Sequence, residues 1–268
     1  MKKSSGWKQA LTFSLAGFFA TAVTYGPARM GFGLFLPEFR GEFALSTGTA
    51  GFIASAAFLG FLLALPVAAG LTSRFGPRPP ILVGGLLAFA GMALVAASLN
   101  RMMLAVGIAV AGSSAGFCWT PYNNAAPEMT AEDVRPHVLS AISTGTTIGV
   151  TAAGGVAALI AFSNHSWRIA WGSFAACGIL MTAFNFFALR DAGGRLGSRA
   201  ADTATGASEA GFQGLFEPRA IPLFLLALSF GATSAIYLSF AADRVAAAGG
   251  LAGLPPRASS PALFIAYG

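Results

Sequence analysis

Seven long apolar stretches, separated by short polar segments, constrain this chain more than any other feature of its sequence. An α-helix needs about 20 mostly apolar residues to cross the hydrocarbon core of a bilayer. Each stretch is long enough, so we predict an all-α transmembrane protein, a helical bundle with one span in each stretch. The predicted spans cover residues 10–37, 47–72, 79–99, 102–126, 137–162, 167–189 and 219–241.

Composition supports the same class. Only 10% of the residues are charged, whereas soluble globular domains carry roughly 25%. The net charge is +6, but the Lys and Arg residues lie at the ends of apolar stretches and form no basic stripe, so we expect no nucleic-acid partner. The two cysteines lie inside apolar stretches without metal-ligand spacing, so we expect no metal. The expected partners are the lipid bilayer and a small-molecule substrate.

The distribution of basic residues predicts the orientation. With the N-terminus in the cytoplasm, the cytoplasmic segments hold ten Lys and Arg residues and the outer segments hold five. The positive-inside rule therefore favours a cytoplasmic N-terminus. The first apolar stretch runs well past the 7–15 residues of a signal-peptide core, and we predict that it is retained as a span.

One polar segment divides the chain. Residues 191–218 are rich in Gly, Ala and Ser with scattered charge, which predicts a flexible cytoplasmic linker. It separates an N-terminal six-helix bundle at 1–190 from the beginning of a C-terminal bundle at 219–268. Ala262 to Gly268 are again mostly apolar, and we expect an eighth span to begin there and the natural chain to continue. The alternative is a complete seven-helix protein whose tail ends on an apolar patch.

The loop between the second and third predicted spans carries a motif. It reads Ala69-Gly70-Leu71-Thr72-Ser73-Arg74-Phe75-Gly76-Pro77-Arg78. This resembles the signature loop of the major facilitator superfamily, in which a Gly opens the motif, an Asp-Arg-x-Gly-x-Arg core follows, and the loop steadies one conformation. Arg74, Gly76 and Arg78 match the core, whereas Ser73 replaces the Asp and Ala69 replaces the first Gly. The resemblance therefore implies a gating loop at Arg74, Gly76 and Arg78.

Other features resemble the same superfamily. Six spans precede a cytoplasmic linker, and Trp167-Arg168 opens the sixth span. The segment Tyr25–Pro37 is similar to the first span of an uncharacterised bacterial branch. The fifth predicted span is glycine-rich, with Gly145, Gly149, Gly154 and Gly155. Gly145, Gly149, Ala152 and Val156 share one helix face, which we interpret as a seam for close helix packing.

The resemblance implies a function as well as a fold. It implies a secondary active or facilitative transporter that moves a small organic solute by alternating access between two six-helix bundles. Such a protein is not an enzyme and needs no cofactor. It would be a multi-pass protein of the bacterial inner membrane with a cytoplasmic N-terminus.

Arg29 lies within the first predicted span. A charge there costs at least about 2.5–3.5 kcal/mol on insertion scales, so it is expected to face a cavity or a partner. Tyr25 and Phe32 lie on the same helix face. Because a guanidinium presents fixed donors to a carboxylate or phosphate, we predict that Tyr25, Arg29 and Phe32 bind an anionic group of the substrate. The alternative is that Arg29 pairs with an acidic residue of another helix or reaches the membrane surface.

Three other spans offer polar side chains for the same cavity. Trp119, Tyr122 and Asn123 have the spacing of one helix face in the fourth span, where the alternative is a packed helix seam. A further face holds Thr144 and Thr147, whose hydroxyls could equally bond their own helix. Tyr237 is the candidate from the seventh span. The substrate is predicted to be an organic anion or an amphipathic compound.

The chain lacks several features of other mechanisms. No Asp or Glu lies deep in a predicted span, so protons are a candidate coupling ion without an evident carrier here. The sequence has no phosphate-binding Gly loop ending in Lys-Ser or Lys-Thr, which argues against ATP-driven transport. A seven-helix membrane receptor or sensor is the main alternative, but a retinal protein needs a late lysine and none follows Lys8. A membrane enzyme would need clustered His, Asp, Glu or Cys, which the spans lack.

Overall fold

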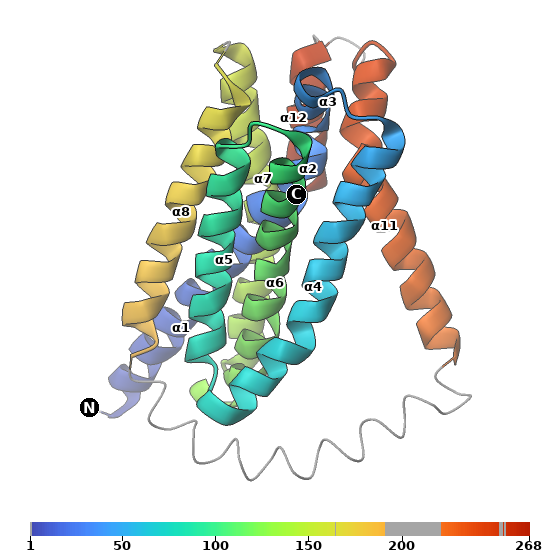
Figure 1. Cartoon of the computed structure of the whole chain (residues 1–268). Helices are drawn as coiled ribbons and strands as arrows, with labels where there is room; N and C mark the ends of the chain where they lie inside the picture. The colour runs from blue at the N-terminus through green and yellow to red at the C-terminus, as the bar shows by residue number, and fades with distance from the viewer. Residues whose placement is uncertain (1, 164, 191–220, 252–253, 255) are drawn as a thin grey trace.

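The computed structural model describes residues 2–163, 165–190, 221–251, 254 and 256–268, and the helices there run up and down in a bundle (Figure 1). Labels follow Figure 1. In chain order the helices are α1 (Lys2–Tyr25), the π-helical segment η1 (Gly26–Met30), α2 (Gly31–Leu34), α3 (Leu36–Phe43), α4 (Thr47–Phe75), α5 (Arg78–Ala96), α6 (Arg101–Met129), α7 (Arg135–Phe162), α8 (Trp167–Ala188), α11 (Ile221–Ala247) and α12 (Pro256–Tyr267). The predicted linker at 191–218 lies outside the described residues, so the domain boundaries stay a prediction.

Helices α4 to α8 match five of the seven predicted spans. Each is long and apolar enough to cross a membrane. The first and seventh predicted spans are not among these five within the described part of the chain. For the first, the reason is that its apolar stretch is divided between α1, η1, α2 and α3 instead of forming one helix.

Polar residues set the ends of several helices. The side chains of Ser46, Asn100 and Ser166 cap α4, α6 and α8 by accepting backbone N–H groups of the first turn. Such caps satisfy donors that the helix itself leaves unpaired. At the other end of α4, Gly76 has φ 79°, a conformation that a residue with a Cβ adopts only with strain. The chain therefore turns at Gly76 and enters α5.

The bundle is built by close pairing of helices. Helix α6 packs along α4 and α5, α5 packs along α8, and α7 packs along α1. The glycine seam predicted for the fifth span is confirmed, because a Cβ built on Gly145 or Gly149 would overlap backbone carbonyls of Phe18 or Ala22 in α1. Glycine allows these two backbones to approach in the way that small residues do in membrane bundles.

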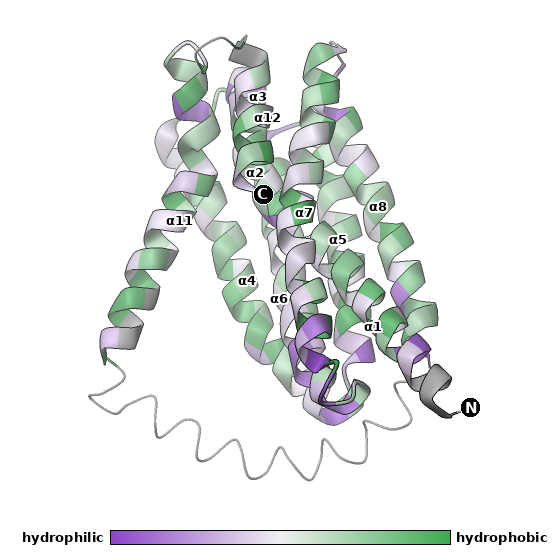
Figure 2. Cartoon of the chain, turned by 180° about the vertical axis from the view of Figure 1, so that it is seen from behind, coloured by the Kyte–Doolittle hydropathy of each residue, from purple (hydrophilic) through white to green (hydrophobic). Residues whose placement is uncertain are grey.

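The outside of the bundle is largely hydrophobic (Figure 2). Phe52, Leu62 and Phe187 are among the large apolar side chains that are more than half exposed. A soluble protein rarely exposes a continuous apolar surface, so lipid is the solvent that this surface suits. Inside, Phe39, Trp171 and Ile53 belong to one buried apolar cluster, and a second cluster surrounds Phe13, Tyr122 and Ile142.

The two helices that follow the linker position lie against the first part of the chain. Helix α11 contacts α2 and α3 at one end, which we call the α3 end, and leans away from the bundle toward the opposite end (Figure 1). Helix α12 packs along α7. It begins at Pro256, six residues before the predicted start at Ala262, and its role as an eighth span stays a prediction.

Candidate functional site

Arg29 lies where the first helix is interrupted. The α-helical pattern of α1 ends at Tyr25, and Gly26–Met30 form a π-helical turn with Pro27 near its start. Proline removes a backbone donor and so disrupts the regular ladder, and π-turns inside helices are frequent at functional sites. The interruption sets the position of the Arg29 side chain, which is half-buried.

Aromatic rings surround the guanidinium of Arg29. Its central carbon lies 3.9 Å from the ring centroid of Phe61, 5.1 Å from that of Tyr25 and 5.2 Å from that of Phe58. The Nε atom is buried without a hydrogen-bond partner. Among the described residues the ion pairs are Arg40–Asp243 and Arg168–Glu42, so the alternative of an acidic partner for Arg29 finds no support there.

Trp119 of α6 belongs to the same aromatic group as Tyr25. Its ring lies 5.3 Å from Tyr25, which brings α6 to the interrupted part of the first helix. Asn123, one turn further, donates from Nδ2 to the Trp119 carbonyl at 2.9 Å. The amide nitrogen of Asn123 is therefore satisfied within its own helix.

A small crevice adjoins Arg29. It has a volume of about 10 Å³, which is room for no more than one water. Phe32 lines it together with Ala54 and Phe58, and Leu238 and Ser239 of α11 close it. This crevice therefore lies between the first part of the chain and the helix that follows the linker position.

A larger pocket lies beside Tyr25. Its volume is about 160 Å³, and α7 and α12 supply most of the wall. Thr147 lines this pocket. The ring centroid of Tyr237 lies 5.7 Å from that of Tyr267, which is another lining residue. The lining residues are Tyr25, Met30, Thr146, Thr147, Val150, Tyr267 and Gly268.

Two predicted residues lie elsewhere. Tyr122 has no exposed surface, and its hydroxyl donates to Oδ1 of Asn185 in α8 while its ring packs on Phe13. It therefore has the packed-seam position that was the alternative for this face. Thr144 is exposed and its hydroxyl donates to the Ser140 carbonyl at 2.8 Å. It does not line the pocket beside Tyr25.

The motif loop between α4 and α5 contacts α8 at the end of the bundle opposite the α3 end. Arg78 begins α5, and its Nη2 donates to the Phe186 carbonyl in the last turn of α8 at 3.1 Å. Its guanidinium also lies 4.7 Å from the Phe186 ring. A cation at a helix C-terminus is favourable because the free carbonyls there carry partial negative charge. Arg74 is exposed, so in this loop Gly76 and Arg78 make the fixed contacts.

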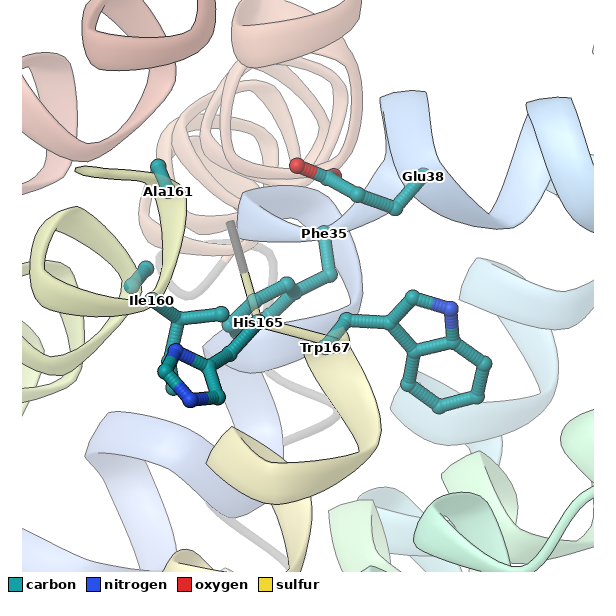
Figure 3. A pocket seen from close by; sticks show the side chains of 7 residues that line it. Phe35, Glu38, Ile160, Ala161, His165 and Trp167 are labelled. Carbon is teal, nitrogen blue, oxygen red and sulfur yellow. The ribbon is translucent and has the colours of Figure 1, made fainter. Parts of the chain in front are cut away.

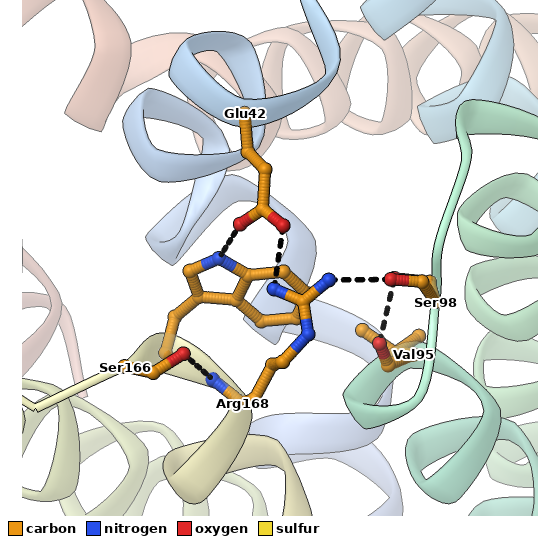
Figure 4. A network of polar contacts seen from close by, with 6 residues as sticks. Glu42, Val95, Ser98, Ser166 and Arg168 are labelled. Carbon is orange, nitrogen blue, oxygen red and sulfur yellow. Dashed lines mark hydrogen bonds and ion pairs between the residues drawn. The ribbon is translucent and has the colours of Figure 1, made fainter.

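Sequence reasoning missed a polar network at the α3 end (Figure 4). Arg168 pairs with Glu42 at 2.6 Å, and its Nη2 donates to the Ser98 carbonyl at 2.5 Å. The indole of Trp167 donates to the other Glu42 oxygen at 2.7 Å. The Trp167-Arg168 pair thus joins α8 to α3 and to the end of α5. A pocket of about 350 Å³ lies nearby, with Glu38 and His165 on its wall (Figure 3).

The family model of the Major Facilitator Superfamily matches residues 13–266, nearly the whole chain. The chain belongs to this superfamily. Members of this superfamily are membrane transporters, and the five long apolar helices in the described part of this chain fit a multi-pass membrane protein. The match does not favour the seven-helix receptor or sensor.

Curated relatives match parts of this superfamily member. Monocarboxylate transporter 13 of Bos taurus is 35% identical over 40% of this chain and 25% of its own length. A chloramphenicol resistance protein of Streptomyces lividans is 29% identical over 82% of this chain and 55% of its own length. The chain therefore spans at most about half the length of these two relatives.

Two solved transporters share the fold. The xylose transporter XylE of E. coli, in an inward-open conformation, has a TM-score of 0.53 at 17% identity and covers 79% of this chain and 58% of its own. The peptide transporter POT, in complex with sulfate, has a TM-score of 0.52 at 17% identity and covers 90% of this chain and 50% of its own. At this identity the likeness shows the fold alone.

Proposed function

We propose that this chain forms the first part of a secondary active or facilitative transporter that moves a small organic anion across the membrane by alternating access. The observation that carries the proposal is the position of Arg29. It is a half-buried cation at a helix interruption and has no ion pair among the described residues. It lines the crevice closed by α11, and its neighbour Met30 lines both that crevice and the pocket beside Tyr25.

In this proposal Arg29 binds the anionic group and the neighbouring side chains hold the rest of the solute. Tyr25, Phe32 and Trp119 supply aromatic surface, while Thr147 and Tyr237 supply or approach the polar wall. The described part of the pocket beside Tyr25 has a volume of about 160 Å³.

The relatives support an anionic solute without assigning one. Four of the curated relatives are monocarboxylate transporters by name, which fits a site built on a single guanidinium. The chloramphenicol resistance protein makes an amphipathic compound the second candidate, because it matches more of this chain than the others do. The aromatic walls of the site would suit the apolar part of either solute.

The packing of α11 supports alternating access. The helix contacts α2 and α3 at one end and leans away from the bundle toward the other (Figure 1), so that the helix after the linker position is joined to the first part of the chain at one end. We propose that the N-terminus is cytoplasmic in a bacterial inner membrane, so that the α3 end is the outer end. Arg74, Gly76 and Arg78 would then form the gating loop at the cytoplasmic end.

The proposal also covers the coupling ion and enzymatic activity. Neither the crevice at Arg29 nor the pocket beside Tyr25 is lined by an Asp or a Glu among the described residues. If protons are the coupling ion, their carrier lies elsewhere in the whole protein or on the solute itself. We propose no enzymatic step, because the chain belongs to a superfamily of transporters.

The test is transport by the protein expressed from its complete gene in proteoliposomes. A panel of labelled monocarboxylates, dicarboxylates, neutral sugars and chloramphenicol identifies the solute class. We expect uptake of a monocarboxylate, and a loss of about tenfold or more in Arg29→Ala, since hydrogen bonds to a charged group contribute about 1.5–3 kcal/mol. Arg101→Ala, at the exposed start of α6, is the control. Normal transport by both Arg29→Ala and Arg29→Lys at normal expression would overturn the role of Arg29.

A further inference from the structure

Two phenylalanines of α4 contact the cation that the proposed function requires. Phe58 and Phe61 lie one helical turn apart, so that both rings project toward the same side of α4. The guanidinium carbon of Arg29 lies 5.2 Å and 3.9 Å from their centroids. Both side chains are half-buried, unlike Phe52 of the same helix, which is 73% exposed. The two inner rings are therefore placed to act on Arg29, and Phe52 is not.

We infer that Phe58 and Phe61 take the place of a counter-ion for Arg29, and that they are positioning residues for the anion site. The inference rests on the proposed function and deepens it. Ring faces attract a guanidinium through their negative quadrupole, and the attraction is stronger where water is excluded. The rings thus stabilise the charge of Arg29 and fix the plane of its guanidinium.

A carboxylate partner would have a different consequence. It would accept hydrogen bonds from the same guanidinium edge that a substrate carboxylate needs, because Arg binds carboxylates through parallel N–H donors. A ring face occupies none of these donors. The described residues place no carboxylate against Arg29, so no fixed counter-ion holds its donors.

The charge balance of the site also limits the substrate. Arg29 is the one charged side chain among the described residues that line the crevice, and the described residues around the pocket beside Tyr25 include no charged side chain. A monoanion bound there neutralises this charge, whereas a dianion would leave one negative charge buried without a partner, at a large desolvation cost. The site therefore selects a small monocarboxylate over a dicarboxylate with the same carbon skeleton.

The experiment measures transport of a monocarboxylate and of its dicarboxylate analogue by the protein expressed from its complete gene. Phe61→Leu and Phe58→Leu remove the ring faces, and Phe61→Tyr keeps one. Phe52→Leu is the matched control on the same helix. We expect Phe61→Leu to raise KM for the monocarboxylate by about tenfold with kcat changed far less, because the cation–π contact orients the site. Phe61→Tyr should restore KM, and Phe52→Leu should leave it unchanged.

A second pair of variants separates positioning from packing. Phe61→Glu supplies an internal counter-ion, and Phe61→Gln has the same shape without the charge. Competition for Arg29 predicts that Phe61→Glu loses monocarboxylate transport while Phe61→Gln retains the activity of Phe61→Leu. Equal loss in the Glu and Gln variants, or a fall in kcat without a rise in KM in Phe61→Leu, contradicts the inference.

The outcomes also separate this inference from the proposed function. If the wild-type protein moves no anion, or if Arg29→Ala transports normally, the proposed function fails and the inference fails with it. If Arg29→Ala abolishes transport while every phenylalanine variant behaves like wild type, the proposed function stands and the inference alone is wrong. Equal transport of the monocarboxylate and the dicarboxylate contradicts the charge selection.

Discussion

The arginines at the α3 end and the arginine at the helix interruption are held in different ways. Arg40 pairs with Asp243 at 2.8 Å and Arg168 pairs with Glu42 at 2.6 Å, and each also donates to a backbone carbonyl. Arg29 instead lies among the rings of Tyr25, Phe58 and Phe61 and has no ion pair among the described residues. The difference indicates that the first two charges fasten helices together, whereas the third remains available to a ligand.

The two ends of helix α11 also differ in how they are held. At the α3 end, α11 is bound to α3 by the Arg40–Asp243 pair and touches α2 at Gly33. Toward the opposite end it leans away from the bundle (Figure 1). The contacts at the α3 end therefore hold this conformation together, and changes there should alter stability or conformation before they alter solute binding.

The largest effect on this closure is expected from Gly33→Ala. A Cβ built on Gly33 would overlap the backbone carbonyl oxygen of Leu238, and a backbone group yields less than a flexible side chain. Overpacking of this kind costs about 1–3 kcal/mol, so α11 should separate from α2 and the apparent melting temperature in detergent should fall. Gly155→Ala is the matched control, because nothing lies within 4 Å of its new Cβ.

A second measurement reports the separation directly. A cysteine at Leu238, which is buried in wild type, should react faster with a membrane-impermeant thiol reagent when Gly33 carries a Cβ. The exposed Cys177 is replaced first, whereas Cys118 is buried. An unchanged labelling rate and an unchanged melting temperature in Gly33→Ala would show that the contact does not close the α3 end.

A smaller effect is expected from Arg168→Ala. The variant removes the ion pair to Glu42 and the hydrogen bond to the Ser98 carbonyl. Because the two side chains are 30% and 40% exposed, solvent screens the pair, and the expected destabilisation is about 1 kcal/mol. Comparison of Arg168→Ala, Glu42→Gln and the double variant isolates the coupling energy. A coupling energy of zero would mean that the Trp167–Glu42 hydrogen bond alone orders this end.

Much of the fold could be predicted from the sequence because lipid imposes long apolar helices. The helices α4 to α8 match predicted spans, and the close contact of Gly145 and Gly149 with α1 follows from small residues at four-residue spacing. The division of the first span was harder to place. Pro27 indicates an interruption, but the sequence does not distinguish a simple bend from a π-helical turn.

The site could be predicted only in part, because the sequence of a uniformly apolar helix does not indicate which of its faces points into the bundle. Arg29 is conspicuous as a charge in an apolar stretch, yet its partners Phe58 and Phe61 lie in a stretch of α4 with no polar face to mark which side turns inward. Tyr122 shows the reverse problem. Helix α6 is covered on several sides, so a residue three positions from Trp119 faces Phe13 and Asn185 and not the site.

A still smaller effect is expected from Asp243→Asn. The change removes the charge that faces Arg40, while the Arg40 donors to Leu45 and Thr47 remain in place. With side chains 23% and 19% exposed, the pair is partly screened, and its loss should cost roughly 0.5–1 kcal/mol. The labelling rate at position 238 should rise modestly, since this pair ties α3 to α11. A rate as high as in Gly33→Ala would mean that the charge, and not the backbone contact, closes the α3 end.

The smallest effect on stability is expected from Arg29→Met, and it makes the comparison sharpest. Removing a paired arginine leaves a carboxylate without its partner, but Arg29 has no ion pair among the described residues to leave behind. The lost cation–π contacts are worth about 2 kcal/mol where they are desolvated, and the relieved cost of a charge within a span is at least about 2.5–3.5 kcal/mol. Because these terms nearly cancel, the apparent melting temperature should stay the same or rise slightly, although transport is lost. A melting temperature that falls by as much as in Arg168→Ala would place Arg29 with the arginines that fasten helices, and would remove the reason to regard its charge as available to a ligand.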